Sequence, residues 1–200
     1  MKIFGKMLVC SLLTVSAAAF AADPAPAAAA APAAEESLLF NGDFSAKPLS
    51  TNRHWGKTEG SKWLEGWIGV SAESSMLDDK VFVSAPTSMK LVSTDHKKGA
   101  ETRYWSIKAL KPNTKYRLSC MLKTENIQGK GGVTLNLVDT ANRWFPKKNI
   151  TGTNDWTKIE IEYTTAPGTN QGKLPCTLGL KIVAATGTAW FDDVKLVEIK

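Results

Sequence analysis

The chain has 200 residues, enough for one domain or for one domain with tails, against a prior of roughly 100–200 residues per domain. It has 25 Lys and Arg against 19 Asp and Glu, a net charge of +6, with 7 Trp, 3 Cys and 2 His. So few His and Cys argue against a His-based metal cage and a thiol-rich scaffold. An excess of basic residues is typical of proteins that bind nucleic acid, a membrane surface or an acidic polymer. What the charge means therefore depends on where it lies in the chain.

The first 22 residues have the pattern of a targeting segment. Lys2 and Lys6 precede an apolar run over residues 7–20, and small residues follow it. This order predicts a secretory signal peptide over residues 1–22, because the apolar run is shorter than a transmembrane helix needs. Without Lys2 and Lys6 the chain has 23 basic and 19 acidic residues, a net charge of +4. We therefore expect a secreted, periplasmic or cell-envelope protein with no transmembrane segment after cleavage.

Residues 23–36 are almost entirely Ala and Pro, with three prolines among them. Proline prevents a continuous helix, and this composition contains nothing that packs into a core. The segment is expected to be an extended or disordered linker. The folded domain is therefore predicted to span residues 37–200.

From residue 37 onward the pattern is that of β-strands. Apolar and polar residues alternate in the runs that begin at Tyr116, Val133, Ile159 and Leu178, as expected of half-buried strands. Glycine-rich stretches, including residues 129–132 and 185–187, read as breaks between strands. About eight to ten strands without repeats or βαβ units predict an all-β fold, a two-sheet antiparallel β-sandwich or jelly roll.

Several short motifs occur in an order that resembles a known family. They are Asn41-Gly42-Asp43-Phe44, Gly66-Trp67, Lys111-Pro112-Asn113-Thr114-Lys115-Tyr116, Asp155-Trp156 and Trp190-Phe191-Asp192-Asp193-Val194. Together they resemble carbohydrate-binding modules of the CenC type (families 4, 9, 16 and 22), within the galactose-binding-like jelly rolls. The resemblance implies a sandwich with a cleft or loop site for a glycan, and often one structural calcium ion. Because a fold does not define a function, the site needs its own argument.

The pair Asp192-Asp193 is the candidate metal site. Phe191 and Val194 are three residues apart, so they face the core together only if a β-bulge lies between them. Carboxylates at a bulge suit Ca²⁺, and the resemblance also implies a calcium ligand at this position. Ser45 stands where the family usually has an acidic ligand. The alternative is that one aspartate accepts hydrogen bonds from backbone N–H groups.

Two tryptophans lie in polar segments without alternation, Trp55 in residues 50–57 and Trp144 in residues 141–149. A flat aromatic side chain in a loop provides an apolar platform for the C–H face of a sugar. We predict Trp55 and Trp144 as glycan contacts. The alternative is that each anchors its own loop.

The polar phase of the strands provides a second set of candidates. Arg117 is expected to donate hydrogen bonds to sugar hydroxyls, Asn136 to form hydrogen bonds with them, and Tyr104 to stack on a ring. The resemblance implies a concave sheet that binds a single glycan chain through such residues. An ordinary solvated sheet is the alternative for each of them.

Cys120 and Cys176 lie on the apolar phases of their strands. Outside the cytoplasm the environment is oxidising, and such a pair can form a disulfide there. A disulfide between Cys120 and Cys176 is therefore one expectation, and two buried thiols are the other.

Three functions remain open. The first is a secreted, non-catalytic module that binds a polysaccharide or glycan, expected to be a monomer. The second is an envelope structural or protein-interaction module with the same fold. The third is a small polysaccharide lyase using Tyr104, Arg117 and a histidine, which lacks a visible acid–base set, so we expect no enzyme. Scattered basic residues and export argue against nucleic acid.

Overall fold

The structure is a computed structural model, and it describes residues 36–45, 48–49, 63–64, 66–69, 74–107, 110–138, 144–146, 149–167 and 176–200. The chain divides into Met1–Ala34 and Glu35–Lys200. The first unit lies outside the described residues, and with it the predicted signal peptide and nearly all of the predicted linker. No helix in the described ranges is long and apolar enough to cross a membrane.

The described part of the domain consists of strands. They are β1 (Pro48–Leu49), β2 (Trp63–Leu64), β3 (Trp67–Gly69), β4 (Ser75–Asp78), β5 (Ser88–Ser93), β6 (Ala100–Ile107), β7 (Lys115–Val138), β8 (Trp144–Pro146), β9 (Gly152–Thr164) and β10 (Cys176–Glu198). Every pairing between them is antiparallel.

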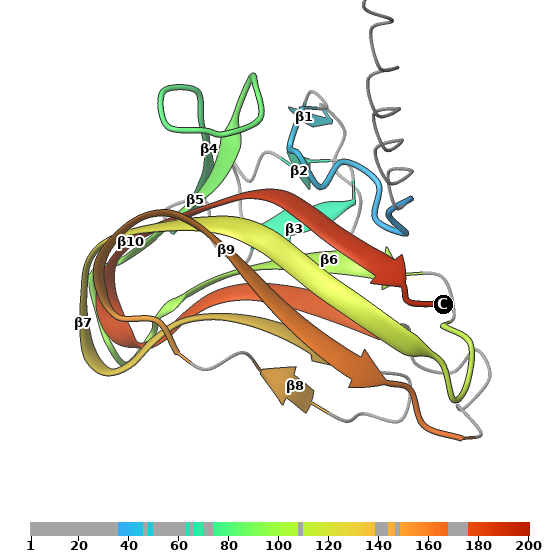
Figure 1. Cartoon of the computed structure of the whole chain (residues 1–200). Helices are drawn as coiled ribbons and strands as arrows, with labels where there is room; N and C mark the ends of the chain where they lie inside the picture. Colours follow the sequence, from blue (N-terminus) through green and yellow to red (C-terminus); the bar gives the residue numbers. More distant parts are fainter. Residues whose placement is uncertain are drawn as a thin grey trace, which may run out of the picture. The chain divides into compact units, whose positions relative to one another are not determined.

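The strands form two layers that share the long strands β7 and β10 (Figure 1). In the first layer the order is β1-β2-β3-β6-β10-β7-β8, using residues 177–183 of β10 and 132–138 of β7. In the second layer the order is β4-β5-β10-β7-β9, using residues 188–198 of β10 and 116–125 of β7. This is the predicted antiparallel β-sandwich.

The core lies between the layers and follows the predicted alternation. Leu178, Leu180 and Ile182 of β10 are buried opposite Val133, Leu135 and Leu137 of β7 in the first layer. In the second layer, Leu118, Cys120 and Leu122 of β7 are buried beside Ile159 of β9 and Phe191 of β10. Trp67 closes one end, packing on Phe44 and Tyr104 with ring centroids 4.9 and 5.2 Å apart.

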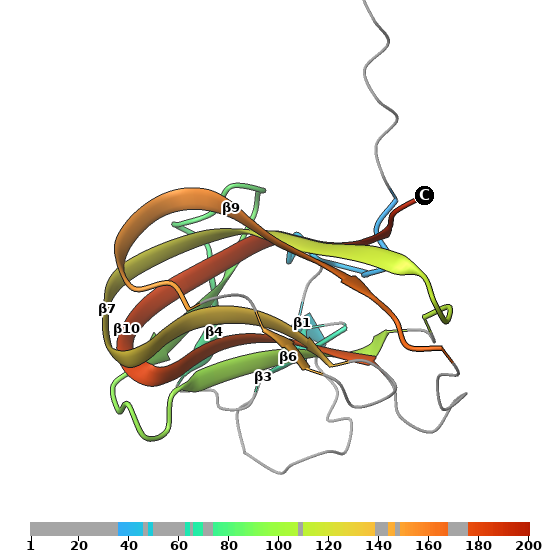
Figure 2. The same ribbon diagram turned by 60° about the horizontal axis from the view of Figure 1, so that its bottom comes forward.

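The glycine-rich stretches read from the sequence as breaks are bends inside continuous strands. Figures 1 and 2 show β7 and β10 turning together from one layer to the other. A Cβ on Gly131 would lie 1.9 Å from the Val183 carbonyl oxygen, and one on Gly129 2.4 Å from that of Ala184. Gly187 has φ of +124° and approaches Asn126 equally closely. Glycine is therefore required where the two backbones bend against each other.

The two ends of the folded domain lie beside each other. The Leu38 N–H donates to the Leu196 carbonyl at 2.7 Å, and the Leu196 N–H donates to the Ser37 hydroxyl at 3.2 Å. Near them the Asn41-Gly42-Asp43 turn packs against β10, where the Val194 N–H donates to the Gly42 carbonyl at 2.8 Å.

The predicted bulge in the last strand is present. The register of β10 against β7 shifts between Asp192 and Lys195, and both Phe191 and Val194 are buried. Asp192 is completely buried, and one of its carboxylate oxygens accepts the N–H groups of Val83 and Ser84, each at 2.7 Å. The other oxygen accepts the Asp193 N–H at 2.7 Å. This carboxylate therefore ties the loop between β4 and β5 to the sandwich.

We predict that Asp192→Asn destabilises the domain by about 2–3 kcal/mol, because an amide nitrogen replaces one acceptor and leaves buried N–H donors unpaired. The control is Asp193→Asn, since Asp193 makes an exposed ion pair with Lys195 at 2.8 Å. Asn also tolerates the φ of +48° at that position, so Asp193→Asn should lower the free energy of unfolding by no more than about 1 kcal/mol. Urea denaturation measures both, and equal losses would contradict the assigned role of Asp192.

Candidate functional site

The candidate site is the outer face of the first layer, on β6, β10, β7 and β8. Directly paired residues of antiparallel strands belong to the same face of a sheet, so the register shows which positions share it. Three rows cross the strands, Trp105-Thr177-Val138-Trp144, Arg103-Gly179-Asn136-Pro146 and Glu101-Lys181-Thr134. The backbone thus places two tryptophans at the two ends of one row and polar residues in the neighbouring rows.

Charged residues gather at one side of this face. Glu101 accepts hydrogen bonds from Arg103 through both carboxylate oxygens, at 2.6 and 2.9 Å, and forms an ion pair with Lys181 at 2.7 Å. Burial acts to raise the pKa of the Glu101 carboxyl, but the bonds and charges of Arg103 and Lys181 outweigh it and hold the pKa below its ordinary value. The carboxylate therefore stays charged at neutral pH.

A buried acceptor lies at the centre of the face. Asn136 is 4% exposed, and its Oδ1 has no hydrogen-bond partner among the described residues. This oxygen lies over Gly179, because a Cβ on that glycine would be only 2.5 Å from it and 2.6 Å from Lys181 Cε. A buried acceptor without a donor costs free energy, so this oxygen can accept a hydrogen bond from a further group.

The prediction that Tyr104 stacks on a sugar is wrong. Tyr104 is on the core side of β6, 6% exposed and packed edge-on against Trp67. Its hydroxyl accepts the Phe40 N–H at 3.0 Å. The sequence contains the reason, because Ala100, Thr102 and Tyr104 alternate with the outward-facing Glu101 and Arg103.

Arg117 and Asn136 do not share a face, contrary to the prediction of one polar surface. Arg117 is on the first part of β7, on the outer side of the second layer, where it pairs with Glu162 at 3.0 Å. Asn136 is on the second part of the same strand, beyond the bend. The bend thus separates two residues of one strand into different layers.

The remaining aromatic predictions are described only in part. Trp55 lies outside the described residues. Trp144 is part of β8, opposite Val138, but its side chain also lies outside them. The residues that sequence reasoning missed are Glu101, Arg103 and Lys181, whose signal was their position opposite the core phase of two strands.

The described residues do not fit a calcium ion at Asp192 and Asp193. Calcium takes six to eight oxygen ligands, whereas both oxygens of Asp192 accept backbone N–H groups and Asp193 is paired with Lys195. No group of three or more His, Cys, Asp or Glu suited to a metal occurs in the described ranges. The geometry is that of the alternative, a carboxylate that accepts backbone hydrogen bonds.

Cys120 is buried in the core, and burial raises the pKa of its thiol far above the usual range. The side chain of Cys176 lies outside the described residues, so the disulfide stays a prediction.

Fold and family place the chain among carbohydrate-binding modules. Residues 39–196 match the family model described as BppA domain 1, of the carbohydrate-binding-module 4/9 type. The chain belongs to this family, which confirms the resemblance seen in the sequence motifs.

Solved structures with the same fold include carbohydrate-binding modules. The CBM22-1 xylan-binding domain of Paenibacillus barcinonensis Xyn10C has a TM-score of 0.54 at 12% identity, covering 85% of this chain and 99% of that one. TmCBM61, bound to β-1,4-galactotriose, has a TM-score of 0.53 at 13% identity, covering 82% and 99%. At these identities the likeness shows the fold alone.

Curated relatives are much longer proteins. The tRNA nuclease WapA of Bacillus subtilis (strain 168) is 27% identical over 169 residues, which is 82% of this chain. The tRNA3(Ser)-specific nuclease WapA of Bacillus spizizenii is 26% identical over the same length. This chain spans 7% of the length of each of them.

Because of Glu101, the free energy of unfolding of the domain should depend on pH in the acid range. Because the folded-state pKa is lowered, its contribution is present above the unfolded value near 4.5 and is lost as the pH falls through the folded value. We predict that Glu101→Gln lowers the unfolding free energy at pH 7 and that the difference from the unmodified protein shrinks towards pH 3. Urea denaturation at both pH values checks this, and a difference independent of pH would contradict it.

We also predict that calcium has no effect on stability, because no free carboxylate oxygen of Asp192 remains to bind it. Thermal unfolding in excess EDTA and in excess CaCl₂ should give the same melting temperature. A melting temperature that is higher in CaCl₂, with the increase abolished by Asp193→Asn, would show instead that the ion displaces Lys195.

Proposed function

We propose that this domain is a secreted, non-catalytic module that binds a polysaccharide or glycan chain across the outer face of the first layer. The observation that supports this most directly is the buried Oδ1 of Asn136 in the middle of the three rows, an acceptor for which the described residues offer no donor. A sugar hydroxyl is a donor of the right kind, and the chain belongs to a family of carbohydrate-binding modules.

The positions at the ends of the first row support the same proposal. Trp105 and Trp144 are separated by Thr177 and Val138, so their backbones are about three strand spacings, roughly 14 Å, apart. That separation is enough for sugar rings to lie across the sheet between these two positions, whose side chains lie outside the described residues. Polar groups of the neighbouring row would then meet the hydroxyls of the chain.

The absence of catalysis is part of the proposal and is supported by the position of Tyr104. The lyase hypothesis used Tyr104 as a reacting group, but that side chain is in the core and its hydroxyl accepts a backbone hydrogen bond. We further propose that the protein is a monomer and, from the pattern over residues 1–22, that it acts in the periplasm, the cell envelope or outside the cell.

One observation favours the second function, an interaction module. Phe82 and Val83 are exposed at the loop between β4 and β5, and the Asp192 carboxylate holds that loop in place. Adjacent exposed apolar side chains can form part of a protein-binding surface. It lies on a different segment from the three rows, so the two functions do not compete for the same residues.

We predict that Trp144→Ala lowers glycan affinity roughly tenfold or more, because it removes an aromatic platform at the end of the row. The control is Trp156→Ala, since Trp156 is on β9 in the second layer. Affinity electrophoresis in gels containing a panel of neutral and acidic polysaccharides measures the effect. Migration unaffected by every polysaccharide would contradict the proposed function.

A further inference from the structure

The described charges on the outer face of the first layer do not cancel. Arg103 and Lys181 both bind the single carboxylate of Glu101, which leaves one positive charge. The other described positions of the three rows and the neighbouring Ile68 of β3 are uncharged. The part of the face that the structure describes therefore carries a net positive charge at neutral pH.

Exposure determines which of these charges an incoming molecule meets. The Arg103 side chain is 45% exposed, whereas those of Glu101 and Lys181 are 17% and 16% exposed. Glu101 uses the Nε–H and one Nη2–H of the guanidinium. The remaining N–H groups have no partner among the described residues, so the accessible group is a guanidinium held in position with free donors.

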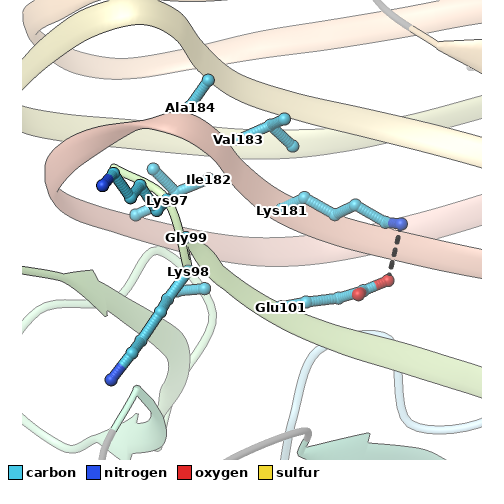
Figure 3. A pocket seen from close by; sticks show the side chains of 9 residues that line it. Lys97, Lys98, Gly99, Glu101, Lys181, Ile182, Val183 and Ala184 are labelled. Carbon is cyan, nitrogen blue, oxygen red and sulfur yellow. Dashed lines mark ion pairs between the residues drawn. The ribbon is translucent and has the colours of Figure 1, made fainter. Parts of the chain in front are cut away.

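A hollow of about 180 Å³ adjoins this cluster, and two further lysines that line it add positive charge (Figure 3). Glu101 and Lys181 line this hollow together with Lys97 and Lys98 of the loop between β5 and β6. In this view the two loop lysines lie to the left of Gly99, and Glu101 and Lys181 lie to its right. Asp95 of the same loop accepts the Lys97 N–H at 2.8 Å, so its carboxylate faces the loop's own backbone. Four cationic groups thus stand against two carboxylates that are already engaged.

We propose that this face selects glycans whose sugars bear carboxylate groups, that is, uronate-containing chains; this inference rests on the proposed function. A carboxylate matches the planar donors of a guanidinium, and such charge-assisted hydrogen bonds are about twice as strong as neutral ones. Hydroxyls of the same chain are the donors that Asn136 Oδ1 lacks. Lys97 and Lys98 raise the local concentration of a polyanion by long-range attraction.

The test uses matched pairs of ligands. Oligomers of galacturonate, guluronate, mannuronate and glucuronate are titrated calorimetrically at pH 7 and low salt, each beside the same oligomer with its carboxylates reduced to primary alcohols. A glycerol-phosphate polymer provides negative charge without carboxylates. We expect at least one uronate oligomer to bind tenfold or more tightly than its reduced form and than the phosphate polymer.

The protein variants locate the effect. Arg103→Gln should weaken binding of the uronate oligomer by roughly 10- to 100-fold and that of the reduced oligomer by much less. Arg117→Gln is the control, because Arg117 also pairs with a carboxylate but lies on the second layer. Thermal unfolding of both variants shows whether each is folded. If Arg103→Gln fails to fold, the double variant Lys97→Gln with Lys98→Gln replaces it. The double variant should lose less affinity for the uronate oligomer at low salt, and this loss should disappear at high salt.

The outcomes separate the inference from the proposed function. Equal affinity for acid and reduced oligomers, equal binding of the phosphate polymer, or equal effects of the two arginine variants would overturn carboxylate selection. Binding of neutral glycans alone would overturn the selection and leave the proposed function standing. No binding of any oligomer or polysaccharide would overturn both.

Discussion

The structure depends on the pairing of β7 with β10 through a shared bend. These two strands remain hydrogen-bonded on both sides of the turn and so build the middle of both layers. Backbones that bend in contact leave no room for side chains at the inner positions, which is why Gly129, Gly131 and Gly187 lie there. A two-layer core, an outer face on each layer and the separation of Arg117 from Asn136 all follow from this one constraint.

The bend also explains the composition of the candidate site. Of these two strands, only the residues after the bend in β7 and before the bend in β10 belong to the first layer, where β10 pairs with β6. Glu101 of β6 and Lys181 of β10 are therefore neighbours although 80 positions separate them in the sequence. Gly179, in the middle row, leaves space for the side chains of Asn136 and Lys181 to lie over the sheet. The face is polar and cationic because of this pairing rather than because of any one motif.

Local pattern was sufficient to predict the sandwich, the alternation in four strand segments and the bulge between Phe191 and Val194. Those features depend on side-chain periodicity, which a single strand displays by itself. The placement of Tyr104 was wrong although Glu101 and Arg103 on the opposite phase indicated the correct one. The Glu101-Arg103-Lys181 cluster was missed for a different reason, since strand pairing across distant segments has no local signal. The glycine stretches were misread as strand ends because a bend and a turn have the same composition.

The neighbouring ends of the folded domain have a mechanical consequence. A pull applied between residues 37 and 196 is taken first by the hydrogen bonds that join Ser37 and Leu38 to Leu196, at the margin of the sandwich. The bend shared by β7 and β10 and the outer face of the first layer lie away from this point of attachment. A tethered domain can therefore bear tension through its attachment while the geometry of its candidate site stays unstrained.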